Sequence, residues 1–548
     1  MTKNLTILFA SFLWIEFASY AYSQSAEVPV YAVHELTFQG SAYRTQDAPA
    51  ATVDFITTWR HESGSPTYTV HGFYDGDGKG GMAGNVFKVR FCPTKPGTWT
   101  LEETASSDAK LKGQHQGYAV NATASSHPGF WRVDEQSPGR RWYRRSDGSH
   151  AYVVGNTLYS FLSEHLKGEP TGGNIADDVR KSAQYFRKLR FAVTGDIFPH
   201  PVEKPFLNDQ GQPTDNGNFS QRPNPAWFSQ RVDLAVQTAY EQDLIADMIL
   251  NGPDSEAARS ALLATAHGGD PAPYLRYIAA RYGSYPHVWL CLSNEYDIRK
   301  PNFAPEAIRT FGHTMKKFLP YDNPLSVHSN QGNWSEDLNS TIDWNDHIII
   351  QNKIKKMSSS ADYTVLNYWI GGGNKPVVND ELAYQGEGDG WSEADVIEAH
   401  LGAFLGGGYG SSGHKSGYKL GHYFAGNFSA EEHTAADNLH WMCQKIDEIN
   451  FWQMRPEYYT YTHEGSSSIF HHLHPDFRVL VGEQEYVLGT NQAHSNILAN
   501  LPDGTWQVTQ LDMIAQQEKQ LATDARGKFT FDAPASRAVL FHFKRLNN

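Results

Sequence analysis

Val288-Trp-Leu-Cys-Leu-Ser-Asn294-Glu295 is a short apolar run that ends abruptly in an amide and a carboxylate. A second stretch, Lys375-Pro-Val-Val-Asn-Asp380-Glu381, repeats this arrangement, and the two glutamates are 86 positions apart. Short apolar runs of this kind are typical of buried strands in a parallel sheet. Barrels of alternating strands and helices carry their catalytic groups at the carboxyl ends of the strands. The two stretches therefore predict both a fold and the position of a site.

Six further apolar runs alternate with helical patterns around these two stretches, as expected for parallel βα units. The predicted strands are residues 151–155, 190–197, 244–250, 288–293, 324–328, 347–351, 376–380 and a glycine-rich run near 405–410. The predicted helices are residues 177–189, 230–243, 271–282, 305–318 and 435–451. Eight strands close a (β/α)8 barrel, which we place at residues 126–454.

The segments on either side of the barrel carry short β runs separated by turn residues. These runs are residues 35–38, 51–55, 68–70, 86–91 and 98–101 before the barrel, and 477–481 and 538–543 after it. Such spacing predicts one all-β sandwich at residues 24–125 and a second at 455–548. The predicted fold class is therefore a multidomain protein, with a (β/α)8 TIM barrel flanked by two all-β sandwich domains.

The N-terminus has the layout of a secretory signal peptide at residues 1–23. Lys3 precedes an apolar run over residues 5–15, and small residues follow before Ser23. No later run approaches the roughly 20 apolar residues that cross a bilayer. We therefore expect a secreted or periplasmic protein with no membrane span. Its three cysteines cannot form a disulfide framework, so its stability must come from packed cores.

Charge and composition narrow the expected partners. The net charge of -14, without a basic run, excludes a protein that binds the phosphate backbone of nucleic acid. The 14 Trp and 28 Tyr residues supply flat rings that can stack on sugars, although core packing is the more frequent use of any one ring. The expected partner is a polysaccharide or oligosaccharide, and nothing in the sequence indicates the oligomeric state.

Two glutamates at the ends of strands four and seven supply the carboxyl groups that hydrolysis of a glycosidic bond requires. One must protonate the leaving oxygen while the other acts at the anomeric carbon of an oxocarbenium-like transition state. We assign Glu295 as the acid/base and Glu381 as the nucleophile of a retaining, double-displacement reaction. Asn294 is expected to hydrogen-bond the sugar hydroxyl beside the anomeric carbon. This reaction requires no cofactor and no metal.

Other side chains at strand ends are secondary candidates for binding the sugar. Each could equally cap a helix, hold a loop or pack in the core. These candidates are Asn156, Asp196, Asn251, His328, Asn330 and Gln351. The rings of Trp369, Tyr384 and Trp391 could stack on a sugar, although core packing is the more frequent use of any one ring.

Two other patterns are explained more simply by structure than by function. The glycine-rich stretch at residues 408–416 imitates a phosphate loop, but His414 separates the glycine from the lysine. The tract His471-His-Leu-His474 suggests a metal site, yet no Cys and no Asp or Glu at matching spacing accompanies it, so a structural cluster is favoured.

The Asn-Glu at strand four and the Glu at strand seven resemble the pattern of clan A retaining glycoside hydrolases. Val154-Gly-Asn-Thr-Leu-Tyr159, together with residues 375–381 and the following Tyr384, looks most like the apiosidase-like barrels. The resemblance implies hydrolysis of O-glycosyl bonds. Asn156, Tyr159 and Gln385 stand where that family tends to have Asp, Trp and Glu, and these positions line the pocket that selects the sugar.

The flanking segments resemble the companions of such barrels. Gly72-Phe-Tyr-Asp-Gly-Asp-Gly78, Val89-Arg-Phe91 and Pro96-Gly-Thr-Trp-Thr100 are similar to an immunoglobulin-like domain that precedes catalytic barrels in bacterial polysaccharide-degrading enzymes. The C-terminal block looks like a β-sandwich of the collagen-binding type, although no residue in it supports collagen binding.

The expected function is therefore hydrolysis of a plant or algal polysaccharide. Two alternatives stay open. A non-catalytic carbohydrate-binding or adhesion protein could keep the barrel as a scaffold. A polysaccharide lyase would use a Tyr or His base beside an Arg or a metal that neutralises a uronate.

Overall fold

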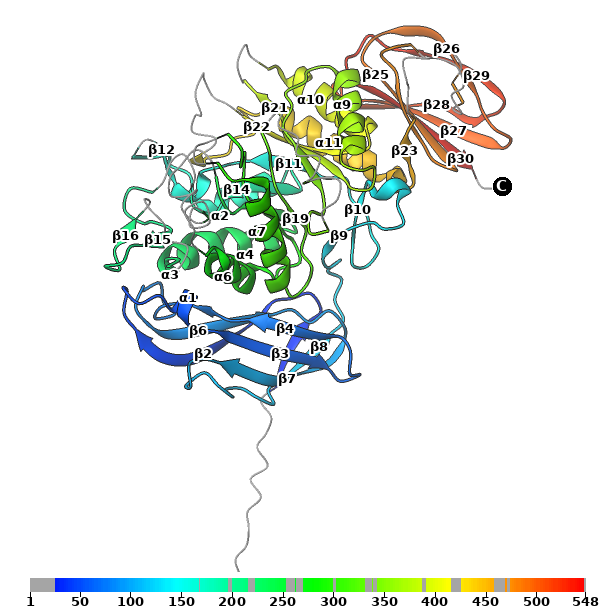
Figure 1. Ribbon diagram of the computed structural model, residues 1–548. Helices are drawn as coiled ribbons and strands as arrows, with labels where there is room; N and C mark the ends of the chain where they lie inside the picture. The colour runs from blue at the N-terminus through cyan, green and yellow to red at the C-terminus, as the bar shows by residue number, and fades with distance from the viewer. Residues whose placement is uncertain are drawn as a thin grey trace, which may run out of the picture.

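A computed structural model describes residues 25–166, 168–195, 200–214, 222–252, 262, 270–298, 302–330, 338, 343–386, 391–414, 425–457, 469–470 and 474–546. The signal peptide predicted at residues 1–23 lies outside these ranges. Two antiparallel sheet regions flank a central barrel, one at the N-terminal end and one at the C-terminal end (Figure 1). The predicted fold class is confirmed, whereas the domain limits stay predictions.

The barrel is an eight-stranded sheet in which every neighbouring pair is parallel. Its strands are β11 (Val154–Thr157), β14 (Lys188–Ala192), β17 (Ile245–Ile249), β18 (Val288–Cys291), β19 (Leu325–Ser326), β20 (Ile348–Ile350), β21 (Val377–Gln385) and β22 (Tyr409–His414). They follow the order β19-β18-β17-β14-β11-β22-β21-β20. A parallel bridge from His328 to Ile349 joins the chain after β19 to β20, which brings the two ends of the sheet together.

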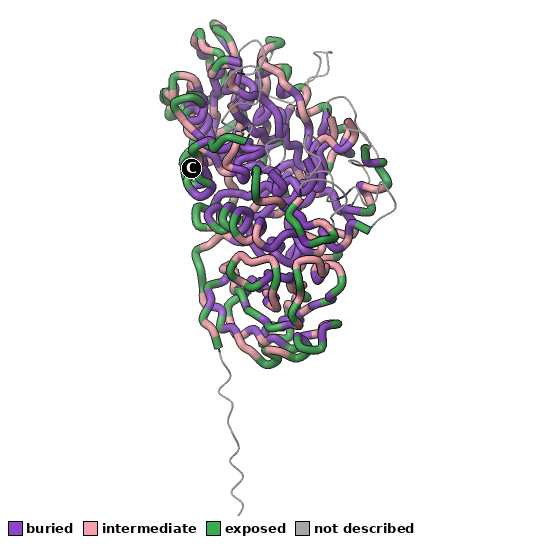
Figure 2. Tube along the Cα trace, turned by 90° about the vertical axis from the view of Figure 1, so that its left-hand side faces the viewer, coloured by how far each residue is buried: buried purple, intermediate pink, exposed green. Residues whose placement is uncertain are grey.

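Helices surround this sheet. They are α2 (Ile175–Ala183), α3 (Pro225–Trp227), α4 (Asp233–Glu241), α6 (Ala272–Tyr282), α7 (Pro305–Phe318), α9 (Met357–Ile370), α10 (Glu393–Leu405) and α11 (Ala435–Asp447). A π-helical turn at Phe228–Val232 and 3-10 turns at Pro138–Arg140, Phe161–Ser163 and Phe451–Gln453 complete them. The barrel interior is the most continuous buried region of the chain (Figure 2).

Three expectations for the barrel need correction. The helix predicted for 177–189 ends at Ala183, because residues 188 and 189 already belong to β14. Leu405 ends helix α10 instead of starting strand eight, which begins at Tyr409. Helices α9 and α10 were not predicted at all. Helix α10 is buried from Asp395 to Leu405, so its sequence lacks the polar face that marks an amphipathic helix.

The N-terminal part is a sandwich of two mostly antiparallel sheets, with the strand orders β1-β8-β7-β3-β4 and β2-β6-β5. Its elements are β1 (Ser25–Pro29), β2 (His34–Tyr43), α1 (Pro49–Thr52), β3 (Phe55–His61), β4 (Thr67–His71), β5 (Phe73–Tyr74), β6 (Gly84–Phe91), β7 (Gly97–Ser106) and β8 (Ala119–Thr123). The strand predicted for 51–55 is wrong at its start, because Pro49 opens a short helix there.

A buried ionic network joins this sandwich to helices α4 and α6 of the barrel. Arg90 of β6 contacts Asp233 of α4 at 2.6 Å, and Arg281 of α6 contacts Asp233 at 2.7 Å and Asp75 at 2.9 Å. Each of these side chains is buried. The N-terminal sandwich is therefore fixed against the outer helices of the barrel (Figure 1).

The C-terminal part is also a sandwich, with sheets in the orders β23-β24-β25-β30-β27-β28 and β26-β29. Its strands are β23 (Arg455–Pro456), β24 (Arg478–Val481), β25 (Glu485–Thr490), β26 (His494–Asn500), β27 (Thr505–Asp512), β28 (Gln517–Ala525), β29 (Lys528–Ala533) and β30 (Val539–Leu546). Leu480, Val487 and Leu540 belong to the same buried cluster as the barrel core. Arg537 contacts Asp395 and Glu398 of helix α10.

Three short strand pairs and one isolated bridge lie outside the barrel sheet. They are β9 (Trp131–Val133) with β10 (Tyr143–Arg145), β12 (His165–Leu166) with β13 (Glu169–Pro170), and β15 (Phe206–Leu207) with β16 (Pro213–Thr214), besides a bridge from Phe206 to Pro223. Among the described helices, none is long and apolar enough to pass through a membrane.

Candidate active site

The barrel interior contains a layer of paired charges. Lys188 and Arg190 of β14 meet Asp247 of β17 and Asp380 of β21, with Lys188 Nζ 3.1 Å from Asp247 Oδ2. Ser411 Oγ of β22 donates to Asp380 Oδ1 at 2.7 Å. All five side chains are buried. The two cations hold the pKa of the Asp380 carboxyl well below its ordinary value even though burial alone would raise it.

An apolar layer lies next to the ionic one, toward the carboxyl ends of the strands. Ala192, Ile249 and Cys291 come two residues after Arg190, Asp247 and Trp289 on the same three strands. Because side chains alternate along a strand, residues two apart face the same side in successive layers. Cys291 is a fully buried thiol in this layer, as expected for a packing residue.

Glu381 lies beyond the apolar layer, in strand β21. This strand is longer than predicted and runs from Val377 to Gln385. Its register against β22 shifts between Asn379 and Ala383, so four steps along β21 match two along β22. Such a bulge re-aims side chains, and β-bulges are frequent beside active sites. It accounts for consecutive residues, Asp380 and Glu381, both directing their carboxylates to buried partners.

Both oxygens of the Glu381 carboxylate accept hydrogen bonds. Tyr159, directly after β11, donates its hydroxyl to Oε1, and Gln351, directly after β20, donates Nε2 to Oε2 at 2.8 Å. Tyr384 Oη lies 3.2 Å from Tyr159 Oη. Burial, followed by the charge of Glu381, raises the pKa of Tyr159 well above its ordinary value, so its hydroxyl stays protonated. Donors on both oxygens stabilise the ionised form of a carboxylate.

Asn294 and Glu295 follow strand β18 at the same end of the barrel. Asn294 Oδ1 accepts from Arg190 Nη2 at 2.7 Å and from the Nδ1 of His328. Because Oδ1 is occupied in this way, the Nδ2 donor of the amide is directed away from Arg190. Glu295 is partly exposed and has a positive φ of 44°, which is uncommon for a residue with a side chain. Such backbone strain tends to occur at functional positions.

His328 is a fully buried histidine between Asn294 and Arg190. Burial, followed by the nearby charge of Arg190, lowers the pKa of His328 to about 3, so the ring is neutral at ordinary pH. A neutral ring that donates from Nδ1 to Asn294 carries its lone pair on Nε2. The predicted residue His328 therefore fixes the orientation of Asn294.

The remaining predicted residues divide by position. Asn156 and Asn251 are buried, and their amides donate to Ser182 at 3.2 Å and Ser293 at 2.9 Å. The backbone of Asn330 donates to Asp297 at 2.9 Å, and Trp391 lies mostly buried beneath Lys355. Asp196 lies outside the described residues.

Trp369, one of the rings considered for stacking on a sugar, lies in a helix. It occupies the last turn of α9, shortly before β21 begins, and is 57% exposed. The helix runs back from the carboxyl end of β20 to the amino end of β21, so Trp369 lies at the end of the barrel opposite Glu295 and Glu381.

Two residues of this arrangement were missed as site residues. Tyr159 was noted only as a difference from a family pattern, and Arg190 only as the start of a strand. A charged residue inside an otherwise apolar strand was the available signal for Arg190, since buried charges require partners. No local pattern announced the contact of Tyr159 with Glu381, which are 222 residues apart.

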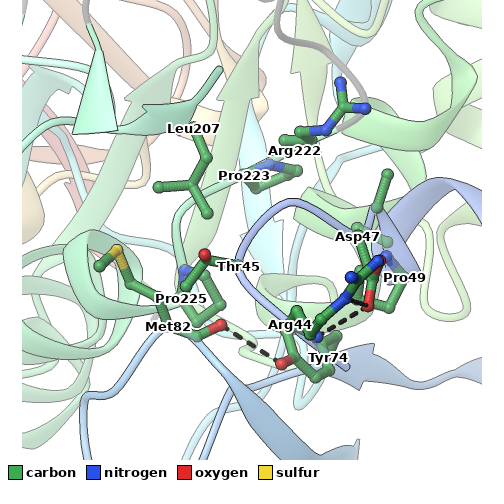
Figure 3. A pocket seen from close by; sticks show the side chains of 12 residues that line it. Arg44, Thr45, Asp47, Pro49, Tyr74, Met82, Leu207, Arg222, Pro223 and Pro225 are labelled. Atoms are coloured by element: carbon green, nitrogen blue, oxygen red, sulfur yellow. Dashed lines mark hydrogen bonds and ion pairs between the residues drawn. The ribbon is translucent and has the colours of Figure 1, made fainter. Parts of the chain in front are cut away.

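A separate hollow lies between the N-terminal sandwich and the β15–β16 hairpin (Figure 3). It encloses about 250 Å³, part of which is open to solvent, and Arg44, Tyr74, Leu207 and Pro223 contribute to its lining. Arg44 is paired with Asp47 at 3.0 Å and Tyr74 Oη donates to Met82 O at 3.3 Å. The barrel side of the hollow comes from the connection between β14 and α4, and not from the segments that carry Glu295 and Glu381.

A parallel eight-stranded barrel with one glutamate shortly after strand four and another at the bulge of strand seven has the architecture of a glycoside hydrolase. The sequence comparison gives the same class, because residues 139–418, just over half of the chain, match the apiosidase-like catalytic domain. The protein is a glycoside hydrolase and belongs to the apiosidase-like family. Residues 27–106 match a domain of unknown function, DUF5060. The resemblances of the barrel and of the N-terminal domain are confirmed, whereas that of the C-terminal block stays a prediction.

Solved structures share the fold at low sequence identity. A protein of Bacteroides vulgatus ATCC 8482, provisionally classified as a glycoside hydrolase, is 18% identical, with a TM-score of 0.71 over 95% of this chain and 100% of that one. A glycoside hydrolase family 5 protein of the same strain is 11% identical, with a TM-score of 0.57 over 76% of this chain and 93% of that one. No curated protein sequence matches the chain.

Proposed function

We propose that this glycoside hydrolase is a secreted enzyme that cleaves a plant or algal polysaccharide with retention of configuration. Glu381 is the nucleophile and Glu295 the acid/base. The observation that carries the proposal is the pair of donors on Glu381, since a phenol and an amide keep this carboxylate ionised and oriented without neutralising it. Glu295 follows β18 at the same end of the barrel and is partly exposed.

The first step forms a covalent intermediate. A carboxylate oxygen of Glu381 attacks the anomeric carbon while the bond from that carbon to the leaving oxygen breaks, and the carboxylic acid of Glu295 gives its proton to that oxygen. In the second step, Glu295 takes a proton from water as the water oxygen attacks the anomeric carbon. The bond from that carbon to Glu381 breaks as the bond to the water oxygen forms, so both glutamates return to their starting states.

The residues around the pair have supporting roles in this proposal. Asn294, held by Arg190 and His328, presents Nδ2 as a donor to the sugar hydroxyl beside the anomeric carbon. Hydrogen bonds to that hydroxyl strengthen in the transition state and supply several kcal/mol in glycosidases of this kind. Gln351 and Tyr159 hold the nucleophile from strands six and one.

The substrate and location rest on sequence features. The signal peptide pattern at residues 1–23 supports export of the protein to a compartment where it meets polymeric glycans. The family description points to apiosides, whereas Asn156, Tyr159 and Gln385 differ from the pattern of that family.

Release of sugar from a glycan panel tests the proposal. The panel contains hemicelluloses, pectins, apiose-bearing glycosides and algal polysaccharides, and the mature chain is compared with Glu295→Gln and Glu381→Gln. We expect reducing ends from at least one glycan with the parent only, and ¹H NMR of the first product should show the anomer of the substrate. The opposite anomer would contradict the retaining mechanism.

The same panel separates the alternatives. An adhesion protein would bind a glycan equally well as parent and as Glu381→Ala, with no release by either. A lyase would produce an unsaturated sugar, visible by its ultraviolet absorbance, and its activity would survive Glu381→Gln.

A further inference from the structure

Three potential metal ligands meet in the C-terminal sandwich, far from the barrel site. One ligand atom from each of His474, Asp476 and His494 lies within 4.8 Å of the others. The sequence tract ending at His474 was interpreted as structural because no acidic residue stood at a familiar spacing. Asp476 follows His474 by only two residues, and the second histidine, His494, is the first residue of strand β26. We propose that these side chains form a binding site for a divalent transition metal of the Zn²⁺ type.

The three side chains are already arranged around a common point. His474 Nδ1 lies 2.7 Å from Asp476 Oδ2. The ring centroids of His474 and His494 are 4.5 Å apart. The ring centroids of Phe477 and His494 are 4.6 Å apart, in an edge-to-face arrangement. The side-chain amide of Gln492 contacts Asp476. These contacts restrict the carboxylate and the second imidazole, so a metal would meet ligands that are partly preorganised.

One imidazole nitrogen of this cluster has an unused hydrogen-bonding capacity. His494 Nε2 is shielded from solvent and has no hydrogen-bond partner among the described residues. Buried polar nitrogens are usually paired, so an unpaired one suggests a missing partner.

The spacing of the ligand atoms suits a small tetrahedral ion. Zinc bonds of about 2.0–2.2 Å in tetrahedral geometry place ligand atoms about 3.4 Å apart. The present maximum of 4.8 Å closes to this value by small rotations of two rings and a carboxylate. Two nitrogens and one oxygen leave the fourth position open to water. Nitrogen ligands favour zinc, nickel or copper over calcium and magnesium.

Such an ion would join the two sheets of the sandwich. His474 and Asp476 lie just before β24 of the six-stranded sheet, whereas His494 is the first residue of β26 in the two-stranded sheet. Nearby, Asn491 donates to Glu398 at 2.8 Å and Arg478 contacts Asp362, so this edge of the sandwich also faces helices α9 and α10. Metal binding would stabilise the sandwich where it meets the barrel.

Titration of the tag-free, chelator-treated chain with Zn²⁺ tests this site, independently of any glycan. Calorimetry should show one ion per chain at this site, and the melting temperature should rise with added Zn²⁺ but not with Ca²⁺ or Mg²⁺. His494→Gln and Asp476→Asn should each weaken zinc binding at least about 10-fold and remove the rise. Co²⁺ should give visible absorption bands of tetrahedral type in the parent and not in the variants.

The control is His313→Gln. His313 belongs to another exposed pair, 3.7 Å from Asp343, without a second histidine in the described surroundings. This variant should bind zinc as the parent does. No uptake by the parent, or unchanged uptake in Asp476→Asn, would overturn the proposal. Asp476→Asn preserves side-chain size, so it decides the question if His494→Gln fails to fold.

Discussion

Asp380 and Glu381 are neighbours in one strand, yet they belong to regions of opposite character. Asp380 reaches into the ionic layer, where Lys188 and Arg190 neutralise its charge. Glu381 reaches toward the barrel mouth, where its described donors, Tyr159 and Gln351, are uncharged. A paired carboxylate contributes to stability, while one oriented by neutral donors retains its charge for an incoming sugar. Residue type alone therefore does not identify a catalytic acid.

Arg190 connects the two regions. It lies beside Asp247 and Asp380 in the ionic layer and also donates to Asn294 at the mouth. A site built on residues locked by buried partners is held more precisely than one built on loops alone. The ionic layer thus supports the residues at the barrel mouth. Variants of the two regions should separate a contribution to stability from a contribution to catalysis.

The largest effect is expected for Glu381→Gln. Without the nucleophile, kcat should fall by a factor on the order of 10⁴ or more. The glutamine can still accept from Tyr159, so the free energy of unfolding should change little. Initial rates and urea denaturation measure the two quantities. Activity near that of the parent would show that Glu381 does not belong to the reactive region.

For Asp380→Asn, the expected effect is a loss of stability. Removing one partner of a buried ionic cluster leaves uncompensated charge on Lys188 and Arg190, which should cost about 3–5 kcal/mol of unfolding free energy. Urea denaturation of the variant measures this loss. Asp177→Asn is the control, because its pair with Arg180 is exposed and should contribute nothing measurable. Equal stability of the two variants would contradict the proposed division.

A smaller effect is expected for Tyr159→Phe. Loss of a hydrogen bond to a charged group costs about 1.5–3 kcal/mol, so kcat/KM should fall about 10- to 150-fold. The acidic limb of the pH–rate profile should move to higher pH, because a carboxylate with fewer donors is protonated more readily. Tyr384→Phe, which removes a hydroxyl next to that of Tyr159, should have the weaker effect. An unmoved limb would argue for a packing role of Tyr159.

The smallest expected effect is the loss of stability that His347 causes as the pH falls. This histidine packs against Trp289 near the ionic layer, and burial lowers its pKa to about 3. Between about pH 6.5, its unfolded value, and pH 3, only the unfolded state takes up the proton, so stability decreases as the pH falls. The contribution should reach about 1–2 kcal/mol by pH 5.

Denaturation of the parent and of His347→Leu between pH 7 and 5 measures this contribution. The variant should lose less stability over that range, while His313→Leu, on the surface, should follow the parent. Asp380 adds its own loss only below about pH 4, because its folded pKa is depressed and protonation begins near the unfolded value. Identical slopes for parent and His347→Leu would exclude this histidine as a source of acid sensitivity.

Much of the barrel could be predicted from local patterns. Helix α7 has the predicted bounds, and seven predicted strand segments overlap the observed ones before the glycine-rich eighth. Helix α10 escaped prediction because it is buried from Asp395 to Leu405 and lacks the polar face that sequence analysis relies on. Helix α9 escaped prediction because Leu366 and Trp369 are exposed while Ser360, Thr364 and Asn367 are buried, which reverses the amphipathic pattern. The position of Trp369 could not be predicted, because an aromatic ring near a strand gives no information about which end of the barrel it occupies.

The sequence by itself determined the alternation of strands and helices, and with it that Asn294 and Glu295 would follow a barrel strand. These features depend on apolar periodicity over a few residues, which is a local property. Only the tertiary structure decided that Asp380 would be neutralised and that Tyr159 and Gln351 would hold Glu381. Those contacts join strands far apart in the chain through a bulge in β21, and no local pattern specifies them.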